Sequence, residues 1–169
     1  MRKPDLHKLI AKDLQLDLPE NFNFNEVPLP LTVKDLFPKK FLFYAYEITD
    51  PPGGRSPDEN KIQIILPEQQ RGERGNFDHR KDYFTILLGY RNDIRVYCLW
   101  DAYLYEDIPF SRNIQVKEAT LTEALSNNIT FQERKLWVGP ETIISCNQLS
   151  LKEALPLRHK LYLKSLSSE

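Results

Sequence analysis

The feature that most constrains the fold is a change in hydrophobic period at residue 41. Before it, residues 4–14 space their apolar side chains along one face of a helix. After it, apolar and polar residues alternate in short runs rich in aromatic and β-branched side chains, which is typical of strands. The runs are FLFYAYEI (41–48), KIQIIL (61–66), DYFTILLGY (82–90), IRVYCLWDAYLYE (94–106), NIQVK (113–117), ITFQERKLW (129–137) and ETIISCN (141–147). This pattern predicts a mainly β protein with flanking helices.

Helical signals lie mostly at the two ends of the strand-rich region. The proline-containing stretch 18–31 predicts an extended connector, and a short helix at 32–37 is an open alternative. Two capping boxes, in which Ser or Thr precedes Glu by three positions, predict later helices: Thr120 with Glu123, and Ser150 with Glu153. We expect Pro156 to interrupt or kink the second of these helices.

The strand count and the short connections predict the architecture. About seven strands with tight turns favour antiparallel pairing and a closed or nearly closed barrel over a parallel sheet. With 169 residues, the chain is long enough for one core. We expect residues 1–40, a helix and an extended connector, to pack on a single domain formed by residues 41–169.

Charge, cysteines and histidines narrow the class of protein. The formal charge is −1, from 23 basic and 24 acidic residues, so binding to a polyanion requires a local cluster of charge. Cys98 and Cys146 are too few for a disulfide framework, and we expect both in the core. His7, His79 and His159 have no partner at metal-ligand spacing. No segment is long and apolar enough to span a bilayer, so we expect a cytoplasmic protein. We also expect that the protein binds no cofactor and no metal.

Three polar loops are the candidate functional segments. The loops TDPPGGRSPDEN (49–60) and DIPFSRN (107–113) are longer than a hairpin needs and mix donors with acceptors. This mixture matches the base edges of the DNA major groove, where arginine binds guanine, amides bind adenine and carboxylates accept from cytosine. The loop EQQRGERGNFDHRK (68–81) combines arginines with glycines, as a phosphate-binding segment does. Solvated loops with internal ion pairs are the alternative interpretation.

The order of these elements resembles a known DNA-binding fold. The stretch RSPDENKIQIILPEQQRGERGNFD…LLGY…VYCLWDAYLYEDIPFSRNIQVK, within residues 41–147, is similar to the B3-like pseudobarrel. That fold occurs in plant B3 transcription factors and in restriction endonuclease recognition domains, including the N-terminal effector domains of Type IIE enzymes. The resemblance implies a seven-stranded antiparallel pseudobarrel whose two arms enter the major groove. It implies base contacts from Arg55, Asp58, Glu59, Lys61, Ser111, Arg112, Asn113 and Gln115, and phosphate contacts from Gln70, Arg71, Arg74 and Lys117.

The functional expectation follows from this resemblance. We expect a non-catalytic, sequence-specific domain that binds double-stranded DNA and serves as the recognition or effector module of a bacterial restriction-modification enzyme. Cleavage would then come from a nuclease or motor domain or subunit, fused or associated. The isolated domain is expected to be monomeric and to have no membrane partner.

Two alternatives remain open. Asp101 with Gln115 and Lys117 mimics a Mg²⁺-dependent endonuclease site, in which a carboxylate holds the metal and a lysine polarises water. Alternatively, the aromatic side chains could form a stacking platform for single-stranded nucleic acid. Against this platform, alternation over 94–105 assigns one face to the interior, formed by Ile94, Val96, Cys98, Trp100, Ala102 and Leu104. It leaves Tyr97, Tyr103 and Tyr105 facing outward or lying under a helix.

Overall fold

Most strands belong to one large mixed sheet, and the others form two small pairs. In the part of the chain that the computed structural model describes, residues 1–50 and 58–167, there are ten strands, three α-helices and two 3₁₀ turns. The strands are β1 (Leu29–Thr32), β2 (Lys40–Glu47), β3 (Glu59–Ile64), β4 (Arg74–Gly75), β5 (Phe84–Arg91), β6 (Val96–Trp100), β7 (Ile108–Pro109), β8 (Arg112–Lys117), β9 (Ile129–Leu136) and β10 (Gly139–Asn147). The helices are α1 (Lys3–Asp13), α2 (Glu118–Asn127) and α3 (Leu151–Ser167), with 3₁₀ turns η1 (Ala102–Leu104) and η2 (Gln148–Ser150).

The strand pairing differs from the expected seven-stranded antiparallel barrel. The large sheet has the order β1-β2-β5-β6-β10-β9, while β3 pairs with β8 and β4 pairs with β7. The pair β2–β5 is parallel, from Phe41 opposite Phe84 to Glu47 opposite Tyr90. After β2 the chain leaves the sheet, forms β3 and β4, and returns to start β5 at the end where β2 began. A connection of this length permits parallel pairing, which a tight hairpin does not.

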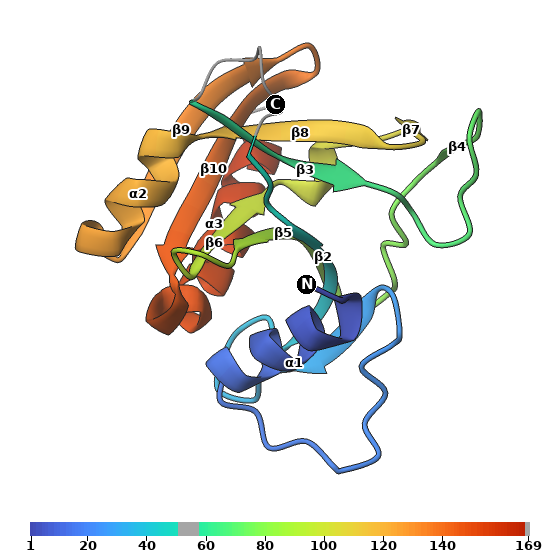
Figure 1. Cartoon of the computed structure of the whole chain (residues 1–169), viewed down its shortest axis with the longest axis vertical. Helices are drawn as coiled ribbons and strands as arrows, with labels where there is room; N and C mark the ends of the chain where they lie inside the picture. Colours follow the sequence, from blue (N-terminus) through green and yellow to red (C-terminus); the bar gives the residue numbers. More distant parts are fainter. Residues whose placement is uncertain (51–57, 168–169) are drawn as a thin grey trace.

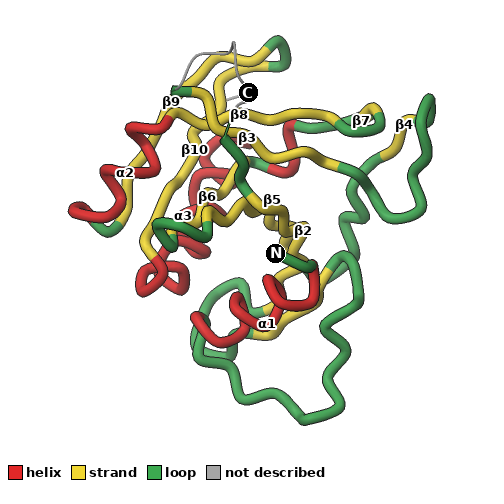
Figure 2. Tube along the Cα trace, in the orientation of Figure 1, coloured by secondary structure: helices red, strands yellow, loops and turns green. Residues whose placement is uncertain are grey.

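Both faces of the large sheet are covered. On one face α1 and α3 contribute Leu6, Ile10, Leu151 and Leu155 to a core. On the other face, β3, β8 and α2 contribute a second core with Ile62, Ile64, Ile114, Val116 and Leu121. Figure 1 shows β3 and β8 crossing in front of the sheet, with α3 behind it, and Figure 2 shows the same layers by type of structure.

Burial on both faces of the sheet determines where the tyrosines of this region lie. Every residue of β6 is buried. Tyr97, expected to face outward or to lie under a helix, is buried in the core formed with α1 and α3 and donates a hydrogen bond to Asp13 of α1. Tyr105 is buried in the other core, at 2% exposure, and Tyr103 is partly exposed. Each face of β6 packs against a different core. Successive residues of this strand therefore alternate between two buried environments, and not between a buried and a solvent-exposed one.

The β3–β8 pair, called the ribbon from here on, lies directly against the large sheet. A Cβ atom on Gly89 of β5 would come within 2.9 Å of Ile62 Cγ2 and 2.9 Å of Trp100 Cζ3, so glycine is required for this close approach. The Trp100 indole donates a hydrogen bond to the Gln115 carbonyl of β8 at 3.1 Å. A bridge between Thr49 and Lys61 joins β3 to the chain just after β2.

Several local expectations change in the structure. Part of the connector forms β1, where Pro30 is tolerated because the strand lies at the sheet edge. Thr32 ends β1, and residues 34–37 form turns and bends instead of a helix. Helix α2 begins at Glu118, so Thr120 lies inside it and does not cap it. Helix α3 continues through Pro156, since buried side chains on both sides of the proline hold it to the sheet. Among the described residues, no helix has the length and apolar character needed to cross a membrane.

Candidate nucleic-acid interface

The two faces of the ribbon differ in chemistry, residue by residue. Asn60, Ile62, Ile64, Ile114 and Val116 face the core and are each at most 3% exposed. The alternate residues face outward and form three cross-strand pairs: Glu59 with Lys117, Lys61 with Gln115, and Gln63 with Asn113. Gln63, Asn113 and Lys117 are exposed, and the other three are partly exposed. The period of two along both strands therefore collects six polar side chains on one surface.

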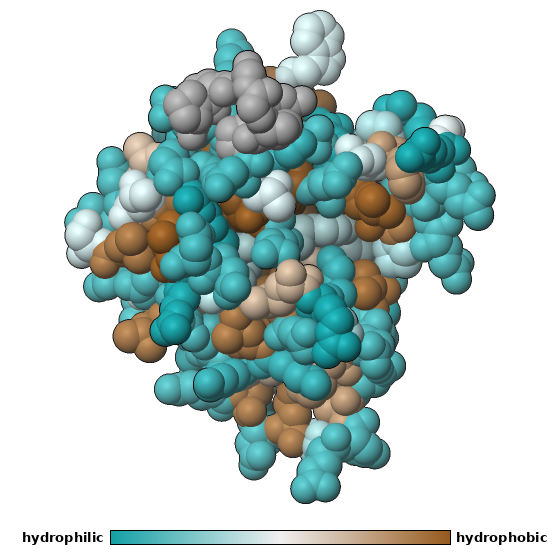
Figure 3. Space-filling model, in the orientation of Figure 1, coloured by the Kyte–Doolittle hydropathy of each residue, from teal (hydrophilic) through white to brown (hydrophobic). Residues whose placement is uncertain are grey.

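This outward face offers both donors and acceptors. The Gln115 amide donates one hydrogen bond to Glu59 Oε2 at 3.3 Å, which leaves its second N–H and its carbonyl oxygen for another partner. The Gln63 amide contacts the Ser111 hydroxyl in the turn before β8. Figure 3 shows that hydrophilic side chains cover most of the face on which β3 and β8 lie, with apolar patches scattered among them.

The backbone of β8 is held in place by side chains of β9. Arg134 Nη1 donates to the Gln115 carbonyl at 3.0 Å, and the Gln132 side chain accepts from the Lys117 amide at 2.9 Å. These side-chain bonds replace ladder hydrogen bonds between β8 and β9. A hollow of about 470 Å³ lies between the two strands and is lined by Gln115, Lys117, Gln132 and Arg134, among others. The polar face of the ribbon therefore stands on a fixed backbone.

A buried polar cluster supports Arg134. Arg134 donates to Glu141 Oε1 at 2.8 Å and to the Tyr105 hydroxyl at 2.6 Å. The Tyr105 hydroxyl in turn donates to Glu141 at 2.8 Å. Burial raises the pKa of Tyr105, and the neighbouring Glu141 carboxylate adds to the shift, so the hydroxyl stays protonated and keeps this bond.

The structure separates Arg112 from the outward face. Arg112 lies two positions before Ile114 and four before Val116, so it belongs to the inward side of β8. Its guanidinium lies 5.1 Å from the centre of the Tyr105 ring. It therefore sits at one end of the ribbon, stacked on an aromatic side chain. Ser111 occupies the turn just before it with a φ of 64°. Asp58 is exposed at the opposite end, where its carbonyl accepts from the Glu118 amide, and Arg55 lies outside the described residues.

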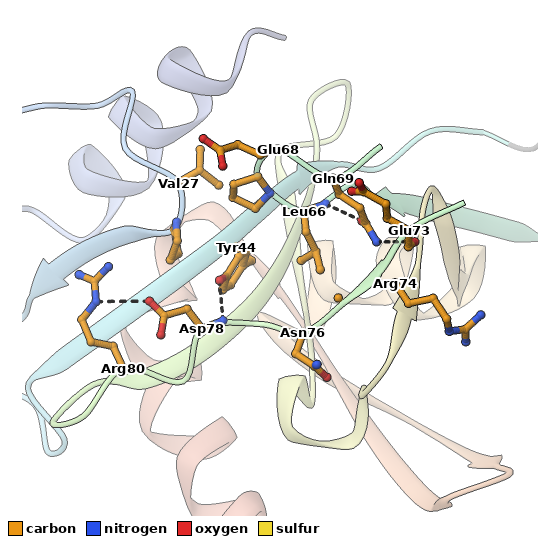
Figure 4. A pocket seen from close by; sticks show the side chains of 13 residues that line it. Val27, Tyr44, Leu66, Glu68, Gln69, Glu73, Arg74, Asn76, Asp78 and Arg80 are labelled. Atoms are coloured by element: carbon orange, nitrogen blue, oxygen red, sulfur yellow. Dashed lines mark hydrogen bonds and ion pairs between the residues drawn. The ribbon is translucent and has the colours of Figure 1, made fainter. Parts of the chain in front are cut away.

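The loop expected to hold phosphates is only partly suited to that role. Part of this loop lines a hollow of about 440 Å³. Arg74 is one of the lining residues, and Figure 4 shows the end of its side chain pointing away from the others. Arg74 instead forms an ion pair with Asp107, with 2.8 Å between Nε and Oδ2. Glu68, Glu73 and Asp78 line the hollow, where they outnumber the two basic residues, Arg74 and Arg80, so the lining carries no excess of positive charge for a phosphate group. Gln70 and Arg71 of the same loop are exposed.

The residues of the nuclease alternative lie in different surroundings. Asp101 is 5% exposed and accepts a hydrogen bond from the Tyr103 amide at 3.0 Å, as the cap of η1. Burial raises the pKa of Asp101, which opposes the ionised form that a metal ligand needs. Lys117 is exposed on the ribbon and lines the hollow beside β9. Residues 1–50 and 58–167 contain no group of three or more His, Cys, Asp or Glu side chains arranged to hold a metal ion.

The aromatic residues proposed as a stacking platform are mostly interior. The buried ones are Phe41, Phe43, Tyr44, Tyr46, Tyr97, Trp100 and Tyr105. Tyr83 and Tyr103 are partly exposed. Tyr103 stacks on Tyr162 with ring centres 4.3 Å apart, so its ring already has an aromatic partner. Little aromatic surface of this set is left to stack on bases.

Two features of this region were not anticipated from the sequence. Arg134 and Glu141 lie seven positions apart on neighbouring strands, and their pairing depends on the β9–β10 register. Trp137 lies at the turn of that hairpin and is fully exposed. A signal for the turn itself was available in the sequence, because a Gly-Pro dipeptide such as Gly139-Pro140 is typical of a turn.

These observations define a mainly β domain with an outward polar ribbon and helices on its flanks. A family model described as methylase-associated X1 matches residues 39–155, and the chain belongs to that family. Membership makes it a methylase-associated domain and connects it to restriction-modification systems. Comparison with curated proteins and with solved structures found no match.

Proposed function

We propose that this chain is a double-stranded DNA recognition domain of a restriction-modification system. The observation that carries the proposal is the outward face of the ribbon, with its three polar cross-strand pairs on a fixed backbone. The major groove of B-DNA admits a two-stranded β-ribbon, and its base edges present donor and acceptor patterns that such side chains distinguish. Membership of a methylase-associated family supports this function, because restriction and modification both depend on recognising a DNA sequence.

The ribbon assigns roles to the predicted contact residues. Lys61 and Gln115 read bases from adjacent positions, and Gln63 with Asn113 forms a second amide-rich pair beside the turn. Glu59 orients Gln115 and accepts from cytosine, and Lys117 contacts a phosphate at the edge of the groove. Arg112 acts from the end of the ribbon, and Arg71 at the loop rim holds the backbone. Asp58 and Ser111 are proposed to contact bases from the flanking turns, and Arg55, which lies outside the described residues, is proposed to contact bases as well.

We also propose that the domain has a B3-like fold. The ribbon is joined to β2 through the Thr49–Lys61 bridge and to β9 through Arg134 and Gln132. These links support a B3-like pseudobarrel, in which we propose that side chains form one seam. Catalysis is assigned to a partner domain or subunit.

Selection of bound duplexes from a random pool tests the function. We expect enrichment of a short motif and much weaker binding of either single strand. The pool is then incubated with the protein and Mg²⁺ and examined for nicks. Binding without preference among duplexes, or equal affinity for single strands, would show that the ribbon does not read sequence. Cleavage of the selected duplex would indicate that the chain is a Mg²⁺-dependent endonuclease.

A further inference from the structure

The turn of the β9–β10 hairpin carries an unusual exposed tryptophan. Trp137 is 103% exposed and the adjacent Val138 is 63% exposed. Tryptophan is normally well buried, because its large ring gains more from leaving water than almost any other side chain. Packing in the hydrophobic core therefore does not explain why a tryptophan occupies this position.

The hairpin holds this indole on a rigid support. Strands β9 and β10 pair continuously from Leu136 opposite Gly139 to Ile129 opposite Cys146. Near the turn, Arg134 is fixed by Glu141 and Tyr105 through hydrogen bonds of 2.8 and 2.6 Å. A stiff hairpin loses little conformational entropy when its tip binds, which favours a contact role for the tip.

The hairpin tip adjoins the proposed reading surface. Trp137, Val138 and Leu136 line a hollow of about 300 Å³ together with Arg112, the arginine at the end of the ribbon. Glu106 lines the same hollow, so its carboxylate offsets the charge of Arg112. Attraction at this point must therefore come from the faces of the indole and the guanidinium rather than from net charge.

We propose that Trp137 is a second DNA-contacting element, which inserts at the edge of the duplex segment read by the ribbon and stacks on a base that is locally unstacked there. This inference rests on the proposed function and extends it. An unstacked base presents an apolar π-face of the kind that an exposed indole stacks on, irrespective of sequence. The ribbon supplies selectivity and the hairpin tip adds affinity and fixes the position of the protein along the duplex.

The chain contains two tryptophans, which makes the contact directly observable. Trp100 is buried and bonded to Gln115, so quenching by acrylamide reports mainly on Trp137. On addition of the selected duplex, we expect the emission of Trp137 to fall and the remaining emission to be shielded from acrylamide. Trp137→Phe should remove most of this change while it largely retains affinity.

Substitution to alanine measures the contribution to binding. Trp137→Ala should weaken the selected duplex by about tenfold or more, since loss of one aromatic–base stack has an effect of this size. Leu149→Ala is the matched control, because Leu149 is also strongly exposed but lies in η2, where it lines a hollow with Lys12 and Pro156. Thermal unfolding confirms that each variant is folded.

The outcomes separate the two proposals. If the wild type binds no duplex, the proposed function fails and the role of Trp137 fails with it. If the wild type binds a selected duplex while Trp137→Ala binds equally and the emission is unchanged, only the tryptophan contact is overturned. Unchanged DNA binding with weakened binding to a purified methylase would assign the hairpin tip to a protein partner, and would also overturn the proposal.

Discussion

The two faces of the ribbon are built from the same two strands and perform opposite tasks. On the inward face, Ile62, Ile64, Ile114 and Val116 are removed from water and hold the ribbon on the sheet. On the outward face, six polar side chains remain in contact with solvent. The inward residues determine whether the ribbon is present, and the outward residues determine what it binds. Substitutions on the two faces should therefore change different measurements.

The largest expected effect is on stability, from the inward face. Ile62 is fully buried against Gly89 of the sheet. Ile62→Ala should lower the free energy of unfolding by about 2–5 kcal/mol, through lost burial and the cavity left behind. Chemical denaturation measures this loss. Ile62→Val is the matched control, with an expected loss of about 0.5–1.5 kcal/mol. Equal stability of the alanine variant would mean that the ribbon does not pack on the sheet.

A smaller loss is expected at Asn60, which is the polar residue among the inward side chains. Asn60 is 0% exposed, donates to Glu118 at 2.6 Å and accepts from Arg91 at 3.3 Å. Both partners are charged, so Asn60→Ala should cost about 1.5–3 kcal/mol of unfolding free energy.

A leucine at this position gives a sharper test of Asn60. Asn60→Leu preserves the volume of the side chain but removes both of its hydrogen bonds, although Arg91 and Glu118 keep their ion pair with each other. It should therefore be destabilising as well. A stable leucine variant would show that burial alone, without hydrogen bonding, is required at this site.

The period of two along β3 and β8 was sufficient to predict these faces. The strands at 61–66 and 113–117, their polar outward residues and the roles of Gln63 and Gln115 as surface amides could all be inferred from alternation. Their pairing with each other could not. The partners of β3 and β8 lie more than 45 residues apart in the chain, and no local signal specifies a contact over that distance.

Long-range burial also explains the wrong assignments. Tyr105 lies in the second core, and alternation alone does not distinguish it from a surface tyrosine, because tyrosine is compatible with both environments. The parallel β2–β5 pair depends on where the chain returns after β4, which the sequence does not encode locally. The ion pair of Arg74 likewise depends on Asp107 of a distant turn, although Arg74 stays exposed.

A third prediction concerns the outward face and binding. Gln115→Ala should weaken the selected duplex by about 1–3 kcal/mol and relax discrimination at one base pair, because it removes one bidentate base contact. Its unfolding free energy should change by at most about 0.5 kcal/mol, as for most surface substitutions. Competition binding with a panel of single-base variants of the motif measures both effects on recognition.

Glutamine at another surface provides the control for Gln115. Gln148 contacts Asp13 on the α1 side of the molecule, and Gln148→Ala should leave DNA binding unchanged. If Gln115→Ala lost stability and retained full sequence discrimination, the outward side chain would be structural and the distinction between the two faces would be lost.

The smallest expected effect is at Arg74, which tests whether the loop differs from the ribbon. Arg74 is half-exposed, and its guanidinium is bonded both to the carboxylate and to the carbonyl of Asp107. If it contacts one phosphate through its remaining donors, Arg74→Ala should weaken all duplexes alike and reduce the slope of log affinity against log salt concentration by about 0.9. Lys160→Ala, on α3, is the charge-matched control and should leave the slope unchanged. A change in the preferred sequence on loss of Arg74 would instead place base recognition in the loop 68–81. The ribbon would then share base recognition with this loop, in which Arg74 is held by an ion pair rather than by packing against a core.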